Sequence, residues 1–151
     1  MHVLMALFGL LIGLMVGMNH SLAQGRNIQP VEYSWQVIRV VDGDTVQFQA
    51  PWVPAPIPQR ISVRVFGVDT PEKGHRAQCP REAALGQRAT EYTTRAVASA
   101  SNVTVMLREW DKYGGRVLGD IMIDGRSLRT MLISEGLARE YFGEAKTSWC
   151  N

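Results

Sequence analysis

The sequence predicts an α+β domain that is mainly β, in which five short strands form a small barrel and two helices complete the fold. Two observations predict this class. Five segments are rich in β-branched residues or alternate apolar with polar residues, and turn signals separate them. Two other segments repeat apolar residues at helical spacing. The composition agrees, because 151 residues that are 46% hydrophobic and 20% charged are typical of one globular domain.

An N-terminal segment is set apart from this domain. Residues 3–18 are apolar with interspersed glycines, and small residues follow at Ser21 and Ala23, where a signal peptidase would cut. We therefore predict a signal peptide at residues 1–23, with export to the periplasm or the medium and no stable membrane association after cleavage. The alternative is an uncleaved anchor, although the apolar run is shorter than the roughly 20 residues that span a bilayer.

The domain is expected at residues 33–151, after a lead-in at residues 24–32. Asp42-Gly43 is a hairpin signal between the first two strands. Four prolines within Pro51–Pro58 force an extended loop before the third strand. The predicted strands are Tyr33–Val41, Thr45–Gln49, Ile61–Phe66, Asn102–Arg108 and Val117–Ile123.

Two helices follow the third and the fifth strand. Pro80 suits a first helical turn, and an apolar stripe continues from there to about Ala100. Ser127 is a suitable N-cap for the second helix, which Gly136 should stop. Three strands, a helix, two strands and a helix in this order favour the five-stranded OB-fold.

Chemically competent side chains concentrate in three clusters. These are Asp42–Thr45 at the first hairpin, Arg64 with Asp69–Glu72 at the end of the third strand, and Asp111–Arg116 between the last two strands. Each cluster alone has a structural explanation, such as a turn or a solvated strand end. Asp42-Gly43-Asp44 does not begin an EF-hand, because the later ligands and the closing glutamate are missing.

Taken together, the clusters suit phosphodiester hydrolysis. The carboxylates of Asp44 and Asp69 are hard donors, which favour calcium, magnesium or manganese over zinc. Arg64 and Arg116 offer planar guanidinium groups that match two oxygens of a phosphate. Glu72 is a carboxylate available to take a proton from water.

These residues also resemble a known family. The runs Val41–Val46, Arg64–Glu72 and Asp111–Arg116, with Glu135–Ala138 further on, are similar to the staphylococcal nuclease (thermonuclease) family over about residues 36–138. The resemblance implies a thermonuclease-like OB-fold barrel with helices. It also implies a calcium-dependent endonuclease that cuts DNA and RNA with little sequence preference and leaves 3′-phosphates.

The resemblance assigns a role to each matching position. One Ca²⁺ would be bound by the carboxylates of Asp44 and Asp69 and by the carbonyl of Thr70. Glu72 would be the general base. The remaining roles are phosphate binding and charge stabilisation by Arg64 and Arg116, contacts to the phosphate end of the nucleotide by Lys112 and Tyr113, and base stacking by Tyr141.

Two departures bear on these roles. Gly114-Gly115 stands where the family prototype has one glycine, so Arg116 comes one residue late, which a glycine pair in a turn can absorb. Tyr141 lies only near the prototype's pair of stacking tyrosines, and a core or surface aromatic is an equal alternative.

The two cysteines, Cys79 and Cys150, lie in the exported part of the chain. Two cysteines in an exported protein usually pair, and the alternative is two free thiols. Their spacing excludes a CxxC redox or zinc site. A bridge would hold the C-terminal tail and fix the end of the basic loop beside Glu72.

Two other functions remain open. One is a non-catalytic OB-fold module that binds nucleic acid or protein. The other is an exported scaffold that uses the loop Pro51–Pro58 as its contact surface. We expect the protein to be a monomer.

Overall fold

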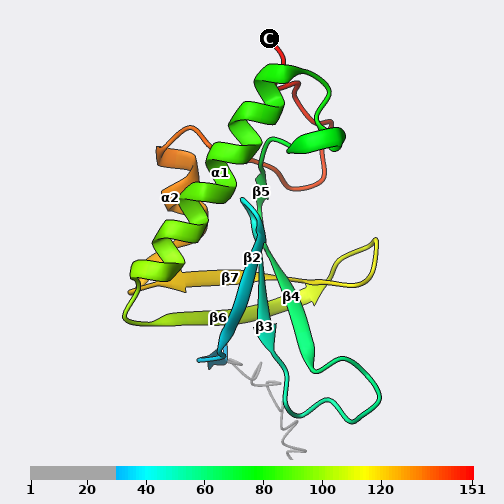
Figure 1. The fold of residues 1–151 in the computed structure, drawn as a ribbon, viewed down its shortest axis with the longest axis vertical. Helices are drawn as coiled ribbons and strands as arrows, with labels where there is room; N and C mark the ends of the chain where they lie inside the picture. The colour runs from blue at the N-terminus through cyan, green and yellow to red at the C-terminus, as the bar shows by residue number, and fades with distance from the viewer. Residues whose placement is uncertain (1–29) are drawn as a thin grey trace, which may run out of the picture.

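A computed structural model describes residues 30–151 (Figure 1). The predicted signal peptide and most of the lead-in lie outside these residues. None of the helices between residues 30 and 151 is long and apolar enough to cross a membrane.

One seven-stranded sheet forms the frame of the domain. Its order is β1-β6-β7-β4-β3-β2, with β8 paired to β7, and a separate two-stranded ladder joins β5 to β9. The strands are β1 Glu32–Tyr33, β2 Val37–Asp42, β3 Thr45–Gln49, β4 Arg60–Val65, β5 Val68–Asp69, β6 Val103–Trp110, β7 Val117–Ile123, β8 Arg126–Ser127 and β9 Arg139–Glu140.

The predicted OB-fold is confirmed in its connectivity. Strands β2, β3 and β4 form an antiparallel meander. Strand β4 then pairs in parallel with β7, and in this ladder Val63 lies opposite Val117. Strand β7 continues antiparallel into β6. Figure 1 shows β6 and β7 crossing the direction of β2–β4, as in a strongly twisted small barrel. The hairpins β2–β3, β3–β4 and β6–β7 were predictable because strands that follow each other in sequence usually pair.

The first predicted strand, Tyr33–Val41, is wrong as one element. The chain forms β1, leaves the sheet at residues 34–36, and re-enters it as β2. The cause is a change of partner, because β1 pairs with β6 whereas β2 pairs with β3. Trp35, in the break, packs its ring between those of Tyr33 and Trp52 at centroid distances of 4.8 and 4.6 Å.

Three boundaries also differ from the prediction. The first hairpin turns at Gly43-Asp44 rather than at Asp42-Gly43, since Asp42 still pairs with Thr45. The third strand begins at Arg60 and ends before Phe66, where Gly67 turns the chain at φ +75°. The fourth strand, β6, extends to Trp110 because its ladder with β7 continues beyond an irregularity at residues 107–109.

The helices cover one side of the sheet and fix the first hairpin. Helix α1, Pro80–Ser99, buries Ala89 against Gly43, and Thr93 Oγ1 donates to the carbonyl of Gly43 at 2.7 Å. Helix α2, Leu128–Ser134, ends shortly before Gly136, as predicted, and Gly136 has the left-handed backbone conformation (φ +67°). A short 3₁₀ helix, Gly74–Arg76, precedes α1.

The predicted disulfide is present. Cys79 is the N-cap residue of α1, and its bond to Cys150 joins the start of that helix to the end of the chain, 71 residues later. Figure 1 shows the C-terminus beside that end of α1.

Candidate active site

Asp44, the turn residue just before β3, forms a largely buried ion pair with Arg64 on the neighbouring strand β4. Arg64 stands opposite Thr45 in the β3–β4 ladder, so its side chain reaches the adjacent Asp44. Arg64 Nε donates to Asp44 Oδ2 at 3.1 Å, and Thr45 Oγ1 donates to Asp44 Oδ1 at 2.8 Å. Asp44 is only 3% exposed. The sheet therefore holds both groups in fixed positions.

The charges around Asp44 act in opposite directions on its pKa. Burial raises the pKa, the Arg64 guanidinium lowers it, and the neighbouring Asp42 carboxyl raises it again, so the pKa lies above its ordinary value. Burial by itself would lower the pKa of Arg64, but the carboxylates of Asp44 and Asp111 raise it. Arg64 therefore links the first and third sequence clusters.

Asp42, which belongs to the first sequence cluster but received no role there, is also a member of this site. Its charge raises the pKa of Asp44. Its Oδ2 lies 3.4 Å from Arg76 Nη2, and among the described residues its buried Oδ1 has no hydrogen-bond partner. Two adjacent carboxylates with an unpaired buried oxygen favour a nearby cation. The two acids flanking Gly43 were the available signal, because a tight hairpin brings its two ends together.

Asp69 lies on the short strand β5 and is approached from the C-terminal tail. Trp149 Nε1 donates to Asp69 Oδ2 at 3.0 Å, and Lys146 Nζ lies 2.6 Å from Oδ1. The two oxygens of Asp69 are thus held by different tail residues, one by an N–H donor and the other by an ammonium. Neither Lys146 nor Trp149 was a sequence candidate, and no local pattern around them points to Asp69.

Glu72 is held mainly by its backbone. Its amide donates to Glu82 Oε1 at 3.3 Å, and α1 approaches so closely that a Cβ on Gly86 would overlap the Glu72 carbonyl. The side chain is 41% exposed and lies 3.2 Å from Arg76 Nε. An ion pair exposed to this extent is weak and opens readily, so the carboxylate stays available to water or a ligand.

Arg116 is placed by the loop that joins β6 to β7. Its Nε lies 2.5 Å from Asp111 Oδ2, and Asp111 Oδ1 accepts from the Tyr113 amide at 3.1 Å. Gly114 and Gly115 both have positive φ, +71° and +73°, so this turn uses backbone conformations that glycine adopts freely.

Asp111 is the charged anchor of this loop. Burial raises its pKa, but the Tyr113 amide and the Arg116 guanidinium lower it more, so the pKa of Asp111 lies below its ordinary value. The carboxylate is therefore ionised at neutral pH and keeps Arg116 beside the end of the hairpin.

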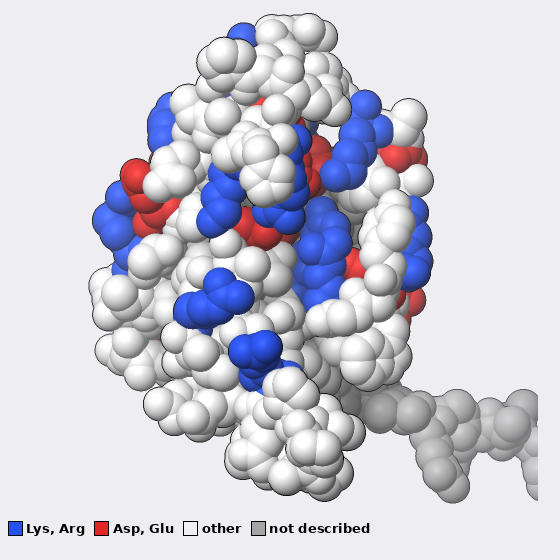
Figure 2. Space-filling model, turned by 45° about the vertical axis from the view of Figure 1, so that its right-hand side comes forward, with Lys and Arg blue, Asp and Glu red and all other residues white. Residues whose placement is uncertain are grey.

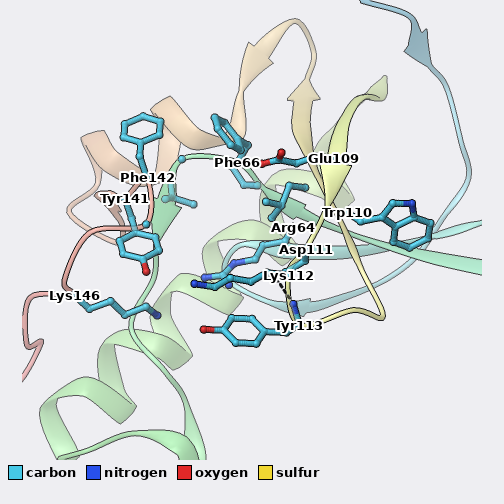
Figure 3. A pocket seen from close by; sticks show the side chains of 15 residues that line it. Arg64, Phe66, Glu109, Trp110, Asp111, Lys112, Tyr113, Tyr141, Phe142 and Lys146 are labelled. Carbon is cyan, nitrogen blue, oxygen red and sulfur yellow. Dashed lines mark hydrogen bonds between the residues drawn. The ribbon is translucent and has the colours of Figure 1, made fainter.

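A pocket of about 350 Å³ opens next to Arg64. In Figure 3, Arg64 and Lys112 point into the space between Tyr113, Tyr141 and Lys146, while the exposed indole of Trp110 points away. Figure 2 shows lysine and arginine side chains around a hollow on this face, with carboxylates between them. A cationic pocket with aromatic walls suits a nucleotide, whose phosphate needs cations and whose base stacks on rings.

A second cavity, of about 270 Å³, lies beside Asp69. Its wall includes Asp69, Thr70 and Glu72 on one side and the tail residues Lys146 and Trp149 on the other. Lys146 lines both cavities.

The structure thus groups most of the predicted site residues, but not into one cavity. Arg64, Lys112, Tyr113 and Tyr141 line the first, and Asp69, Thr70 and Glu72 line the second. Asp44 and Arg116 line neither, and they join the site through Arg64 and Asp111.

The donor set fits a hard divalent cation. Between residues 30 and 151, no three or more His, Cys, Asp or Glu side chains gather into a metal-binding cluster. A cation bound here would therefore have few protein ligands, and water would supply the rest, as Ca²⁺ and Mg²⁺ allow. The unpaired buried oxygen of Asp42 and the cation-paired carboxylates of Asp44 and Asp69 agree with a site for positive charge.

The fold and the site define an OB-fold protein with a cationic pocket next to an acidic cavity. Residues 62–149 match the family described as "Staphylococcal nuclease homologue". The match covers more than half of the sequence, and the chain belongs to this family.

Two curated relatives are similar over most of this chain. The "Thermonuclease" of Staphylococcus hyicus is 32% identical over 115 residues, which are 74% of this chain and 61% of the relative. The "Endonuclease YhcR" of Bacillus subtilis (strain 168) is 29% identical over 117 residues, which are 74% of this chain and 9% of that protein. The chain thus spans less than two thirds of either relative.

Proposed function

We propose that this chain is a calcium-dependent endonuclease that hydrolyses DNA and RNA with little sequence specificity and leaves 3′-phosphates. The observation that carries the proposal is the position of Arg64. Its guanidinium forms an ion pair with the buried carboxylate of Asp44 and lines the cationic pocket, and the charge of Asp111 raises its pKa. Family membership and the names of the two nuclease relatives support the same activity.

Two arginines would bind the scissile phosphate. Carboxylates hold both guanidinium groups before any substrate arrives, so little reorganisation is needed when the transition state forms. Each planar fork can donate to two phosphate oxygens and offset the charge that develops there. Lys112 and Tyr113, from the same loop as Arg116, would hold the phosphate end of the nucleotide, and Tyr141 would stack on a base across the pocket.

Glu72 would be the general base. In the proposed step a water oxygen bonds to phosphorus, the bond to the 5′ oxygen breaks, and the carboxylate of Glu72 takes the water proton. The phosphate stays on the 3′ oxygen, and the leaving oxygen takes a proton from solvent. The exposed Glu72–Arg76 pair has to open for this role.

Asp44 and Asp69, through their carboxylates, and Thr70, through its carbonyl, would hold one Ca²⁺. When bound, the ion would supply positive charge to the phosphate and orient water. All three residues are buried, with exposures of 3%, 5% and 8%, so their positions are set by the fold.

We also propose that the protein is exported to the periplasm or the medium and acts as a monomer. The Cys79–Cys150 disulfide supports export, because such bridges persist in oxidising compartments.

The activity is tested by incubating the purified chain with single-stranded DNA and with RNA, first with Ca²⁺ and then with excess chelator. We expect fragments with 3′-phosphate ends in Ca²⁺ and intact substrate with chelator. Binding without cleavage would reject the enzyme and favour a non-catalytic nucleic-acid-binding module. Cleavage that persists in chelator would reject the metal requirement.

A further inference from the structure

The C-terminal tail supplies both partners of the Asp69 carboxylate. Trp149 donates to one oxygen at 3.0 Å, and Lys146 lies 2.6 Å from the other. Asp69 and Trp149 are both buried, with 5% and 7% of their surfaces exposed. A hydrogen bond to a charged group in such surroundings strongly fixes its orientation.

The tail has no regular backbone structure of its own after Glu140, the last residue of β9. Side chains and the cross-link hold it instead. Arg139 stacks over the Trp149 ring at 3.8 Å, and its Nη1 donates to the carbonyl of Ser148 at 3.0 Å. Cys150, the next residue, is bonded to Cys79.

The other end of the cross-link is tied to the same site. Cys79 begins α1, and the buried carboxylate of Glu82 in its first turn accepts from the amides of Glu72 and Gln78 at 3.3 and 2.7 Å. The start of α1 therefore holds the Glu72 backbone directly and the tail covalently. Both walls of the cavity beside Asp69 are fixed to one helix end.

We propose that the Cys79–Cys150 disulfide is a positioning device for the metal site, and that it acts through Trp149 on the carboxylate of Asp69. An indole N–H can only donate, so it occupies Oδ2 and directs Oδ1 towards a cation. Oδ1 is the oxygen that already faces a positive charge, the ammonium of Lys146 2.6 Å away. This inference rests on the proposed role of Asp69 in calcium binding, and Trp149 is a positioning residue in it.

The test is calorimetric titration of the full-length oxidised chain with Ca²⁺ alone, without nucleic acid. Trp149→Phe keeps the ring over which Arg139 stacks but removes the N–H donor, and it should weaken calcium binding about tenfold, as is typical when an outer partner of a metal ligand is removed. The double variant Cys79→Ser, Cys150→Ser should lose a similar factor. A chain that carries Trp149→Phe together with both cysteine substitutions should lose no more calcium affinity than the weaker-binding of the two variants, because the disulfide is proposed to act through Trp149.

Two further variants sharpen the measurement. Trp52→Phe is the matched control, because that indole is 54% exposed on the loop between β3 and β4 and should leave calcium affinity unchanged. Inserting two glycines between Trp149 and Cys150 keeps the disulfide but no longer fixes the position of the indole, so it should weaken calcium binding. This variant tests the proposal even if the chain without the disulfide does not fold.

Calcium affinity of Trp149→Phe within a factor of two of the wild type would overturn the role of Trp149. Weakened binding in Trp149→Phe, with unchanged binding in the bridge-free or glycine-inserted chain, would overturn the role of the disulfide. A wild-type chain that binds no Ca²⁺ would reject the metal assignment and this inference with it. If the wild type binds Ca²⁺ and cuts DNA, and the variants bind Ca²⁺ with the same affinity, the positioning role is rejected while the proposed function stands.

Discussion

The two cavities of this domain differ in charge and in the way they are built. The 350 Å³ pocket is lined by cations and aromatic rings from β4, from the β6–β7 loop and from the chain after β9. The 270 Å³ cavity carries three carboxylates and one ammonium among mostly polar residues, and it lies between β5, the start of α1 and the C-terminal tail. Lys146 is common to both.

The difference separates two ways of fixing a charged side chain. In the first pocket, Arg64 sits on a central strand whose register places it against Asp44. In the second, Asp69 lies on a two-residue strand, and residues about 80 positions later in the sequence complete its surroundings. A sheet therefore fixes the side of the site that we propose binds phosphate, whereas residues of a cross-linked tail contact the side that we propose binds the cation.

The largest effect is expected from the arginines of the phosphate side. Arg64→Ala and Arg116→Ala should each lower kcat by at least about a hundredfold, because each removes preorganised positive charge from the transition state. Single-turnover cleavage of single-stranded DNA in Ca²⁺ measures this. Arg60→Ala, on an exposed position of the same strand as Arg64, is the control and should retain full activity. Near-wild-type turnover in either site variant would remove that arginine from the mechanism.

Asp44→Asn tests whether the sheet side also contributes to the cation site. It should weaken Ca²⁺ binding at least about tenfold, because a charged oxygen donor is lost. Calorimetric titration measures the affinity. Asp120→Asn is the control, since Asp120 pairs with Arg108 on another part of the sheet. Unchanged calcium dependence in Asp44→Asn would exclude Asp44 as a ligand.

Gly86→Ala tests how tightly α1 holds the acidic cavity. Gly→Ala in a helix usually stabilises by up to about 1 kcal/mol, but here a Cβ would overlap the carbonyls of Pro71 and Glu72. We therefore expect the free energy of unfolding to fall by about 1–3 kcal/mol, as for other overpacked sites. Urea denaturation measures the change, and a stabilised variant would show that α1 does not constrain Glu72.

Lys146→Met should give the smallest effect. It should strengthen calcium binding in the cavity beside Asp69 and weaken nucleic-acid binding in the pocket beside Arg64. Removing the ammonium from Asp69 Oδ1 should strengthen Ca²⁺ binding about threefold, the scale of an ion pair with a half-exposed partner. Binding of a labelled oligonucleotide in chelator should weaken by a similar factor, because the first pocket loses a cation. Weaker calcium binding would show that Lys146 supports the metal site rather than competing with the ion.

Most of the frame could be predicted from sequence because its elements have local causes. Pro80 and the stripe containing Ala89 predicted α1, and Gly136 predicted the end of α2. The five long strands were recognisable from alternation and turn residues. The break at residues 34–36 was not, because its sequence reads as a continuous strand and only the competing partners β6 and β3 divide it.

The candidate site was predictable to the extent that its residues lie in short runs. Asp69, Thr70 and Glu72 fall together on one wall, as their spacing suggested. Asp42 lay in a predicted cluster but received no role, because Asp-Gly is an ordinary turn pair and its unpaired oxygen is visible only once the hairpin packs beneath α1.

The sequence by itself determined which elements form and which chemical groups are present, because periodicity, capping and turn chemistry act over a few residues. Only the tertiary structure decided which charges meet. Lys146 and Trp149 contact Asp69 from about 80 residues away, on a tail that a disulfide joins to the start of α1, and the indole and ammonium pair with a carboxylate that β5 buries. Such partners depend on which loops close and how surfaces pack, and those contacts leave no local pattern in the chain.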